Sequence, residues 1–312
     1  MFPKISSLEK ELAENVKSQA AGNARAMSAT LITLSSYKDA TEIDQWLEHL
    51  MGRRPVRLIH VRGNAPHGNR HWTSARCAID RQARGICFED IFIESSDDAV
   101  YHGRVWGPLV LRELPALLLW NLNLQLLNSC DYDCQERVDL TIIDGSRTSQ
   151  IQTNALVRQR EIILSNLEGD RPLVDLVWEQ LIPIRYAFSR LFEGSQSPTA
   201  KDIEAIKIAI SDPWAAFLLK GWLQDRCKGC PVEVLQTDTK DTLPLASIES
   251  IFVDGTRGQA DVVSPRRAVI KKPDGKALQI SLPDNSIGAI LERLVDTPRP
   301  DPLYHRALKA AQ

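Results

Sequence analysis

The sequence predicts an α/β protein: an N-terminal α/β domain with a mixed sheet, followed by an α+β domain with a largely antiparallel sheet. Two observations support this prediction. In the first half, near-continuous apolar runs that suit buried strands alternate with apolar residues at helical spacing. In the second half, short β-rich runs are separated by Asp-Gly dipeptides, which favour hairpin turns.

The chain opens with an expected amphipathic helix over residues 6–21. Ser6 and Glu9 have the spacing of a capping box, in which each side chain satisfies a free backbone N–H of the first turn. The apolar residues on one face of this helix are Ile5, Leu8, Leu12 and Val16. Such a face requires a packing partner.

A strand, a helix and a second strand are expected next. Residues 27–36 are apolar and β-branched, and apolar residues at helical spacing follow until Gly52. Residues 56–61 then form an apolar run that suits a strand covered on both faces. This pattern predicts a βαβ unit with parallel strands.

The remaining strands of the first domain follow at shorter intervals. Residues 72–79 and 86–93 are too close for a helical crossover, so we expect them to pair antiparallel. Short strands are expected at 116–120 and 138–143, with a helix at 122–129 between them.

The second half begins where helical patterns replace strands. Helices are expected over 155–164, over 184–192 after Pro183, and from Asp212-Pro213-Trp214 to Arg226. The expected strands are 232–235, 248–253, 260–263, 268–272 and 278–282. The predicted organisation is an N-terminal helix (1–28), an α/β domain (29–148) and an α+β domain (149–312).

Composition excludes several functional classes. The 312 residues carry a formal net charge of −2 without a broad basic face, which disfavours nucleic-acid binding. No apolar run approaches the ~20 residues that cross a bilayer. We therefore expect a soluble, cytoplasmic protein with no nucleic-acid or membrane partner, whose six scattered cysteines are reduced.

The common catalytic motifs are absent from the sequence. Neither glycine-rich phosphate loop occurs, and no nucleophile elbow is present, so we predict no catalytic residues and no cofactor. Asp139 and Asp144 bracket a strand and project from opposite ends, which is poor geometry for acid–base work. Asp144 with Gly145 and Ser146 could instead line a ligand crevice at the C-terminal edge of the first sheet.

Cysteine and histidine spacings leave further alternatives open. Cys227-Lys228-Gly229-Cys230 is a possible redox pair, although it lies at a helix C-terminus, where the dipole raises a thiol pKa. Joined to Cys130 and Cys134, it would give a structural zinc site, but nothing in the sequence brings these segments together. Ordinary helix-end cysteines are the favoured interpretation, and we predict no metal. His67 and His71 have ligand-like spacing within a loop and are expected to be solvated.

Arginine and tryptophan mark the expected interaction surfaces, because both residue types are enriched at binding hot spots. The candidate interface residues are Arg53, Arg54, Arg57, His102, Arg104 and Trp106. The glycines and proline around Trp106 predict an exposed indole, whereas most other tryptophans lie in apolar stripes of the core.

Several segments together resemble the glucose-6-phosphate dehydrogenase assembly protein OpcA family. The family has a His-Pro-Ser-Arg corner, a Cys-Cys-Glu-Gln-Ile segment, a Leu-Pro run ending in paired tryptophans, and an Asp-Arg-x-Ile-x-Asp-Ser strand. The matching residues occur in the same order here: Pro55, Arg57, Cys87, Glu89, Ile91, Leu114, Pro115, Trp120, Asp139, Ile142 and Asp144. Leu176-Val177-Trp178 and Leu219-Lys220-Gly221-Trp222 also look like family segments, so the resemblance extends from about residue 30 to about residue 226.

The departures from this pattern affect one implied property. Arg54, Val56, Phe88 and Leu119 replace a His, a Ser, the second Cys and the first Trp of the family, which puts a paired-cysteine device at Cys87 in doubt. The resemblance implies a non-catalytic partner of glucose-6-phosphate dehydrogenase that promotes its active oligomer, raises its activity and so supports NADPH production in the pentose phosphate pathway. The competing hypothesis is a sugar-phosphate sensor or enzyme with its ligand near Asp144.

Overall fold

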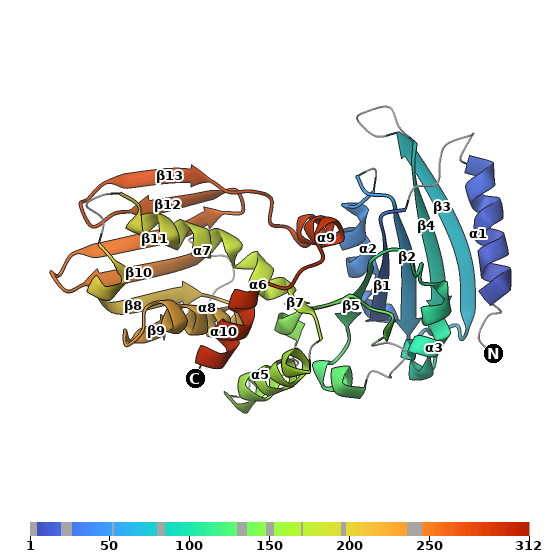
Figure 1. The fold of residues 1–312 in the computed structure, drawn as a ribbon, viewed down its shortest axis with the longest axis horizontal. Helices are drawn as coiled ribbons and strands as arrows, with labels where there is room; N and C mark the ends of the chain where they lie inside the picture. The colour runs from blue at the N-terminus through green and yellow to red at the C-terminus, as the bar shows by residue number, and fades with distance from the viewer. Residues whose placement is uncertain are drawn as a thin grey trace. The chain divides into compact units, whose positions relative to one another are not determined.

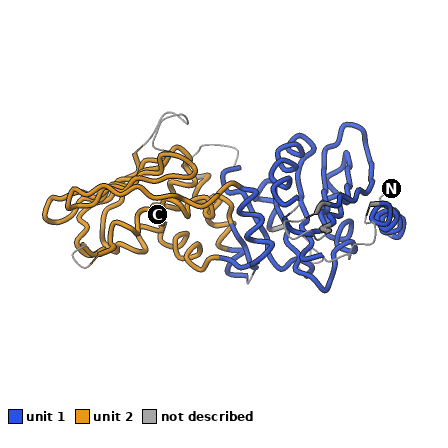
Figure 2. Tube along the Cα trace, turned by 90° about the horizontal axis from the view of Figure 1, so that it is seen from above, with its two compact units in different colours: residues 1–147, 165–174, 287–300 blue, residues 148–164, 175–286, 301–312 orange. Residues whose placement is uncertain are grey.

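The computed structural model divides into two compact units (Figure 2). Unit 1 comprises residues 1–147, 165–174 and 287–300, and unit 2 comprises residues 148–164, 175–286 and 301–312. The structure describes residues 5–19, 27–51, 53–79, 85–129, 136–147, 153–169, 171–194, 198–235 and 245–311. Each unit is built from three segments of the chain that alternate with those of the other unit. The predicted division into consecutive domains, 1–28, 29–148 and 149–312, stays a prediction.

A seven-stranded mixed sheet forms the centre of unit 1, in the order β3-β4-β2-β1-β5-β6-β7 (Figure 1). Its strands are β1 (Ala29–Ser36), β2 (Val56–Gly63), β3 (Arg70–Ile79), β4 (Gly85–Glu94), β5 (Ala116–Asn121), β6 (Leu140–Ile143) and β7 (Leu173–Asp175). β1 pairs parallel with β2 and β5, β2 with β4, and β5 with β6, while β3 and β4 are antiparallel. The predicted mixed α/β sheet is confirmed, and β7 extends it beyond the strand at which we expected it to end.

Helices pack against strands of this sheet. α2 (Ala40–Glu48) connects β1 to β2, and Ile43 and Leu47 are its fully buried aliphatic residues. α1 (Ile5–Gln19) packs against β3 and β4 through the predicted face, since Leu8 and Leu12 are 1% exposed. α9 (Ile287–Asp296), which we did not predict, packs on α2.

One expected helix of unit 1 has a tighter geometry. Leu124–Ser129 forms a 3-10 helix, with Asn123 accepting a hydrogen bond at its start from the backbone N–H of Gln125. Asparagine at this position stabilises a turn instead of continuing an α-helix. A short α-helix, α3 (Gly103–Trp106), lies between β4 and β5.

A six-stranded sheet forms the centre of unit 2, in the order β13-β12-β11-β10-β8-β9. Its strands are β8 (Ile203–Ile210), β9 (Val232–Leu235), β10 (Ala246–Phe252), β11 (Arg257–Ser264), β12 (Arg267–Lys271) and β13 (Ala277–Ser281). All neighbours are antiparallel except β8 and β9, which confirms the largely antiparallel sheet. β8, which lies between β10 and the edge strand β9, was not predicted.

The helices of unit 2 are α5 (Thr153–Glu168), α6 (Leu176–Gln180), α7 (Ile182–Ser189), α8 (Pro213–Arg226) and α10 (Pro302–Ala310). α7 contacts β10, β11 and β12, and α8 contacts β8 and β9. The predicted start of α8 is confirmed, because the Asp212 side chain accepts a hydrogen bond from the N–H of Ala215 at 2.6 Å.

A buried carboxylate joins three distant segments of unit 2. Asp175 is fully buried and accepts hydrogen bonds from the indole of Trp214 at 2.7 Å, the hydroxyl of Tyr304 at 2.9 Å and the backbone N–H of Val177 at 2.9 Å. Burial, together with the charge of Asp175, raises the pKa of Tyr304 well above its usual value. Asp175 therefore fixes α8 and α10 to the start of α6.

Candidate functional site

The C-terminal edge of the unit 1 sheet is where open α/β sheets usually bind ligands. β1, β2, β5 and β6 all end there, at Ser36, Gly63, Asn121 and Ile143. In dinucleotide-binding folds, a glycine-rich turn leads from the first strand to a helix whose N-terminus faces the phosphates. Here the chain leaves β1 through Ser-Ser-Tyr-Lys-Asp, and the side chains of Tyr101, Asp144 and Arg147 occupy this edge.

Arg147 occupies the part of the edge beside the start of α2. It forms ion pairs with Asp144 at 3.1 Å, with Asp39 at 3.6 Å and with Glu42, and its guanidinium lies 5.4 Å from the ring centroid of Trp46. Burial lowers the pKa of Arg147, but the pairs with Glu42 and Asp144 outweigh burial and raise it. An incoming phosphate would have to displace three carboxylates from this arginine, so the arrangement disfavours anion binding.

Asp144, the sequence-predicted crevice residue, is occupied by its own turn. Its carboxylate accepts hydrogen bonds from the N–H of Ser146 at 3.0 Å, from the Ser146 hydroxyl at 2.6 Å and from Arg147. These contacts stabilise the 3-10 turn Gly145–Arg147 that follows β6. Asp139 lies at the other end of β6, where it accepts a hydrogen bond from the N–H of Ala116 at 2.7 Å.

Tyr101 covers the ends of β1 and β2. Its hydroxyl donates to the carbonyl of Ser35 at 2.9 Å and accepts from the N–H of Gly63 at 3.1 Å. A Cβ at Gly63 would lie 2.2 Å from this hydroxyl, so the approach requires glycine. Burial raises the pKa of Tyr101, which keeps the hydroxyl protonated as a donor.

Trp106 supports Tyr101 and is not an exposed anchor. Its side chain is 0% exposed, and its indole N–H donates to the backbone carbonyl of Tyr101 at 3.1 Å. The prediction of an exposed indole was wrong, because the short α3 helix turns the ring into the core. His102 and Arg104, on the same turn, are exposed as predicted, and their role in an interface stays a prediction.

The three clustered arginines predicted to form an interface lie in two different environments: Arg57 is buried, whereas Arg53 and Arg54 lie at the surface. Arg57 is 3% exposed, pairs with the buried Glu89 at 2.8 Å and donates to the carbonyl of Leu109 at 2.9 Å, so its predicted exposure was wrong. An unpaired guanidinium could not be buried here, but the parallel register of β2 and β4 places Arg57 directly beside Glu89.

Arg53 and Arg54 bind the acidic side of α9. Both nitrogens of the Arg54 fork lie 2.5 Å from the carboxylate of Asp296, and this hydrogen-bonded pair raises the pKa of Arg54. Arg53 pairs with Glu292 at 3.2 Å and keeps half of its side chain exposed. Within unit 1, these arginines therefore hold α9 in place, and their role in a protein interface stays a prediction.

Cys227 and Cys230 are free thiols at the end of α8. Cys227 is the C-cap residue, and Gly229, with φ of +84°, turns the chain away from the helix. Burial, followed by the nearby Cys230, raises the pKa of Cys227 to about 11, and burial also raises that of Cys230. The predicted rise of the thiol pKa is confirmed, and burial is its largest cause. The redox role of the two cysteines stays a prediction.

The other metal-ligand candidates are not brought together. His67 lies 3.7 Å from Glu94 and packs edge-on against Tyr37, whereas His71 is exposed on β3. Cys130 and Cys134 lie outside the described residues. Within the described part of the chain, no group of three or more histidine, cysteine, aspartate or glutamate side chains could hold a metal ion.

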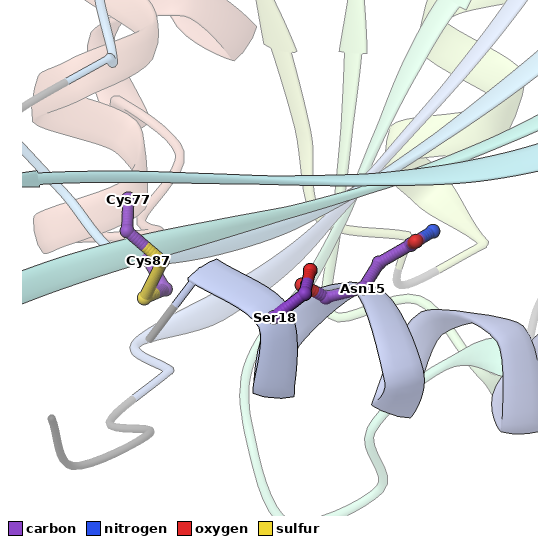
Figure 3. The surroundings of a disulfide bond; sticks show 4 residues. All are labelled: Asn15, Ser18, Cys77 and Cys87. Carbon is purple, nitrogen blue, oxygen red and sulfur yellow. A yellow bond between two sulfur atoms is a disulfide. The ribbon is translucent and has the colours of Figure 1, made fainter. Parts of the chain in front are cut away.

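A disulfide joins Cys77 of β3 to Cys87 of β4, so the expectation of reduced thiols was wrong for these two residues. They lie directly opposite each other in the antiparallel pair, with their Cα atoms 4.1 Å apart. Figure 3 shows the bond beside α1, near Asn15 and Ser18. The sequence contains no sign of this pairing until the register of the two strands is known.

Comparisons with known proteins identify both halves of the chain. The glucose-6-phosphate dehydrogenase subunit N-terminal domain matches residues 47–161, and the corresponding C-terminal domain matches residues 171–308. No curated protein matches. No helix in the described residues is long and apolar enough to cross a membrane.

Solved structures with a similar arrangement are oxidoreductases at low identity. A Gfo/Idh/MocA family oxidoreductase from Vibrio cholerae is 9% identical, covers 91% of this chain and 95% of its own, and gives a TM-score of 0.42. An oxidoreductase from Sinorhizobium meliloti is 11% identical with the same coverage and a TM-score of 0.47. Such low scores carry no functional argument. The two domain matches span most of the chain, and the protein belongs to the OpcA family of glucose-6-phosphate dehydrogenase assembly proteins.

Proposed function

We propose that this protein is a non-catalytic partner of glucose-6-phosphate dehydrogenase that promotes the active oligomer of that enzyme and thereby raises NADPH production. The observation that carries the proposal is the match of two successive domains, both described as subunit domains of that dehydrogenase. The crowded edge of the unit 1 sheet supports a non-catalytic role, because Arg147, Asp144 and Tyr101 are engaged in contacts within the chain.

The proposed mechanism is thermodynamic linkage. A protein that binds the active oligomer more tightly than the less active forms shifts the population toward that oligomer by the ratio of the two affinities. A hundredfold preference shifts the equilibrium by about 2.7 kcal/mol. This mechanism requires an interaction surface and no reacting group.

Titration of the purified protein into the dehydrogenase from the same source tests the proposal. NADPH formation should rise to a plateau, whereas the protein alone, given glucose 6-phosphate and NADP⁺, should form none. Repeating the titration with the dehydrogenase concentrated enough to be fully oligomeric separates two mechanisms. Activation that disappears there indicates assembly, and activation that persists indicates an allosteric effect on the oligomer. No activation at either concentration would contradict the proposed function.

A second candidate function, binding of a small polar metabolite, is favoured by one observation. Asn121, at the end of β5, is 4% exposed, and neither its amide nitrogen nor its carbonyl oxygen has a hydrogen-bond partner among the described residues. A buried amide without partners is unusual and would suit a ligand hydroxyl. Calorimetric titration with glucose 6-phosphate should then show saturable binding that Asn121→Leu abolishes; identical heats from both proteins would exclude binding of this ligand at Asn121.

A further inference from the structure

The face of β3 opposite α1 exposes a tryptophan between two arginines. The positions of Arg70, Trp72 and Arg76 in β3 differ by even numbers, so their side chains project to the same face of the strand. Thr73 projects to the other face, where Asn15 of α1 donates to its hydroxyl at 3.0 Å. Trp72 is 36% exposed, the highest value among the seven tryptophans, all of which the structure describes.

The ring of Trp72 is held in a fixed orientation. It stacks on Phe92 of β4, with 4.6 Å between ring centroids and 7° between planes, and Phe92 stacks on the buried His60 of β2 at 4.3 Å and 8°. The guanidinium of Arg62 lies 5.1 Å from the Phe92 centroid. One side of the indole is therefore packed and the other faces outward. A preformed aromatic anchor loses little conformational entropy when it binds.

The charge presented on this face is positive. Arg76 binds Asp90 through two contacts of 3.0 Å, yet its side chain is 48% exposed while Asp90 is buried beneath it. Arg70 is exposed and has no ion-pair partner among the described residues. Glu94, opposite Arg70 on β4, is 4% exposed and pairs with Arg62. Asp90 and Glu94 thus lie below the surface, whereas Asp44, whose side chain is 42% exposed, is paired with Arg62 at 2.7 Å. Arg70 and Arg76 are the exposed cations of β3.

The edge of β3 is covered, so binding by strand addition is disfavoured at its centre. Glu11 accepts a hydrogen bond from the backbone N–H of Thr73 at 3.0 Å, and Asn15 donates to the Thr73 carbonyl at 3.2 Å. Figure 1 shows α1 beside β3. With its backbone occupied, this part of β3 can offer a partner only its side-chain face.

Two cavities among the described residues are lined by other residues. One in unit 1, of about 310 Å³, is lined by residues that include Leu111, Arg112 and Arg137. One in unit 2 is lined by residues that include Phe252 and Pro273. A flat surface with a central aromatic residue and flanking arginines has the composition of a protein-binding hot spot.

We propose that Arg70, Trp72, Arg76 and Phe92, here called the Trp72 face, bind an acidic segment of the protein partner whose apolar side chain packs on the indole. Carboxylates of that segment would pair with Arg70 and with the exposed side of Arg76. The inference rests on the proposed function in taking this partner to be glucose-6-phosphate dehydrogenase.

Affinity measurements by biolayer interferometry with the dehydrogenase from the same source test the Trp72 face. Trp72→Ala and Arg70→Glu should each raise Kd by about tenfold or more, and Trp72→Phe should recover part of the loss. The matched controls are Arg158→Glu and Tyr186→Ala, exposed positions of unit 2, which should change Kd by no more than about twofold. Circular dichroism and thermal unfolding would establish that each variant is folded.

Salt dependence provides a second readout of the predicted charge. Raising ionic strength from about 0.05 to 0.5 M should weaken dehydrogenase binding by the wild-type protein more than binding by Arg70→Glu. Salt screens the attraction between Arg70 and the carboxylates of the partner, and the variant has already lost that attraction. Wild-type affinity in folded Trp72→Ala and Arg70→Glu would overturn the Trp72 face while leaving the proposed function standing. No binding by the wild-type protein would overturn both. Binding of a single-stranded oligonucleotide instead, lost in Trp72→Ala, would assign the face to nucleic acid and contradict the inference.

Discussion

The two units of this protein hold their buried polar groups in different ways. In unit 1, charged residues lie on adjacent strands, as in the Arg57–Glu89 pair of β2 and β4. In unit 2, the buried carboxylate of Asp175 instead gathers donors from segments far apart in the sequence. Buried polar groups therefore fix the register of strands in the first unit and the positions of helices in the second.

The largest effect is expected from breaking the buried pair of unit 1. Glu89→Leu leaves the guanidinium of Arg57 without its carboxylate and should reduce the free energy of unfolding by about 3–5 kcal/mol. The matched control is the double variant Arg57→Met, Glu89→Leu, which removes both charges and should recover most of the loss. Urea unfolding measures both, and equal losses for the single and double variants would show that the pair does not act as a unit.

The next effect concerns the buried carboxylate of unit 2. Asp175→Asn replaces an acceptor of three hydrogen bonds by a group that must also donate, so we expect a loss of about 2–3 kcal/mol. Tyr304→Phe removes only one donor and should cost less. If Tyr304→Phe proves as costly as Asp175→Asn, the carboxylate is not the centre of this network.

A smaller effect is expected where α8 and α10 approach closely. A Cβ at Gly221 would lie 2.2 Å from the carbonyl oxygen of Ala307, a backbone atom that cannot move away cheaply. Gly221→Ala should therefore destabilise the protein by about 1–3 kcal/mol. Gly169→Ala is the control, because its Cβ would meet nothing closer than 3.4 Å. A thermal midpoint unchanged by Gly221→Ala would mean that the helices can separate at no cost.

The smallest effect is a pH dependence at the end of α8. Because the pKa of Cys227 rises from 9.0 to about 11 on folding, the folded state retains this proton where the unfolded state has lost it. Stability from this thiol is present below pH 9 and falls as the pH rises toward 11. In a Cys230→Ala background, iodoacetamide should label Cys227 with a midpoint near pH 11. A midpoint at or below that of a free thiol would contradict this and favour a reactive pair.

Strands with strong apolar patterns could be predicted from the sequence, as could the pairing of strands that are close in the chain, such as β3 with β4. The order of all seven strands could not. The runs of β1, β2 and β5 are rich in aliphatic residues and are buried on both faces, as strands of a parallel sheet are. Two missed elements did carry a signal, since β8 has isoleucines at every second position from Ile206 to Ile210 and α9 is amphipathic.

The candidate site was harder to predict, because exposure depends on contacts between distant residues. Arg57 and Glu89 are separated by 32 positions and meet only through the register of β2 and β4. The burial of Trp106 depends on the carbonyl of Tyr101, a backbone group without a sequence signature. Trp72 was taken as part of a strand, and only the position of α1 on the opposite face shows that its indole is exposed.

The mass of the complex shows directly whether this protein assembles with the dehydrogenase. Sedimentation velocity of the dehydrogenase alone, this protein alone and their mixture would be recorded at the concentrations of the activity titration. We expect a new species, larger than either component, that contains both chains and whose population rises in parallel with the activity. Unchanged sedimentation of both components in the mixture would contradict this expectation.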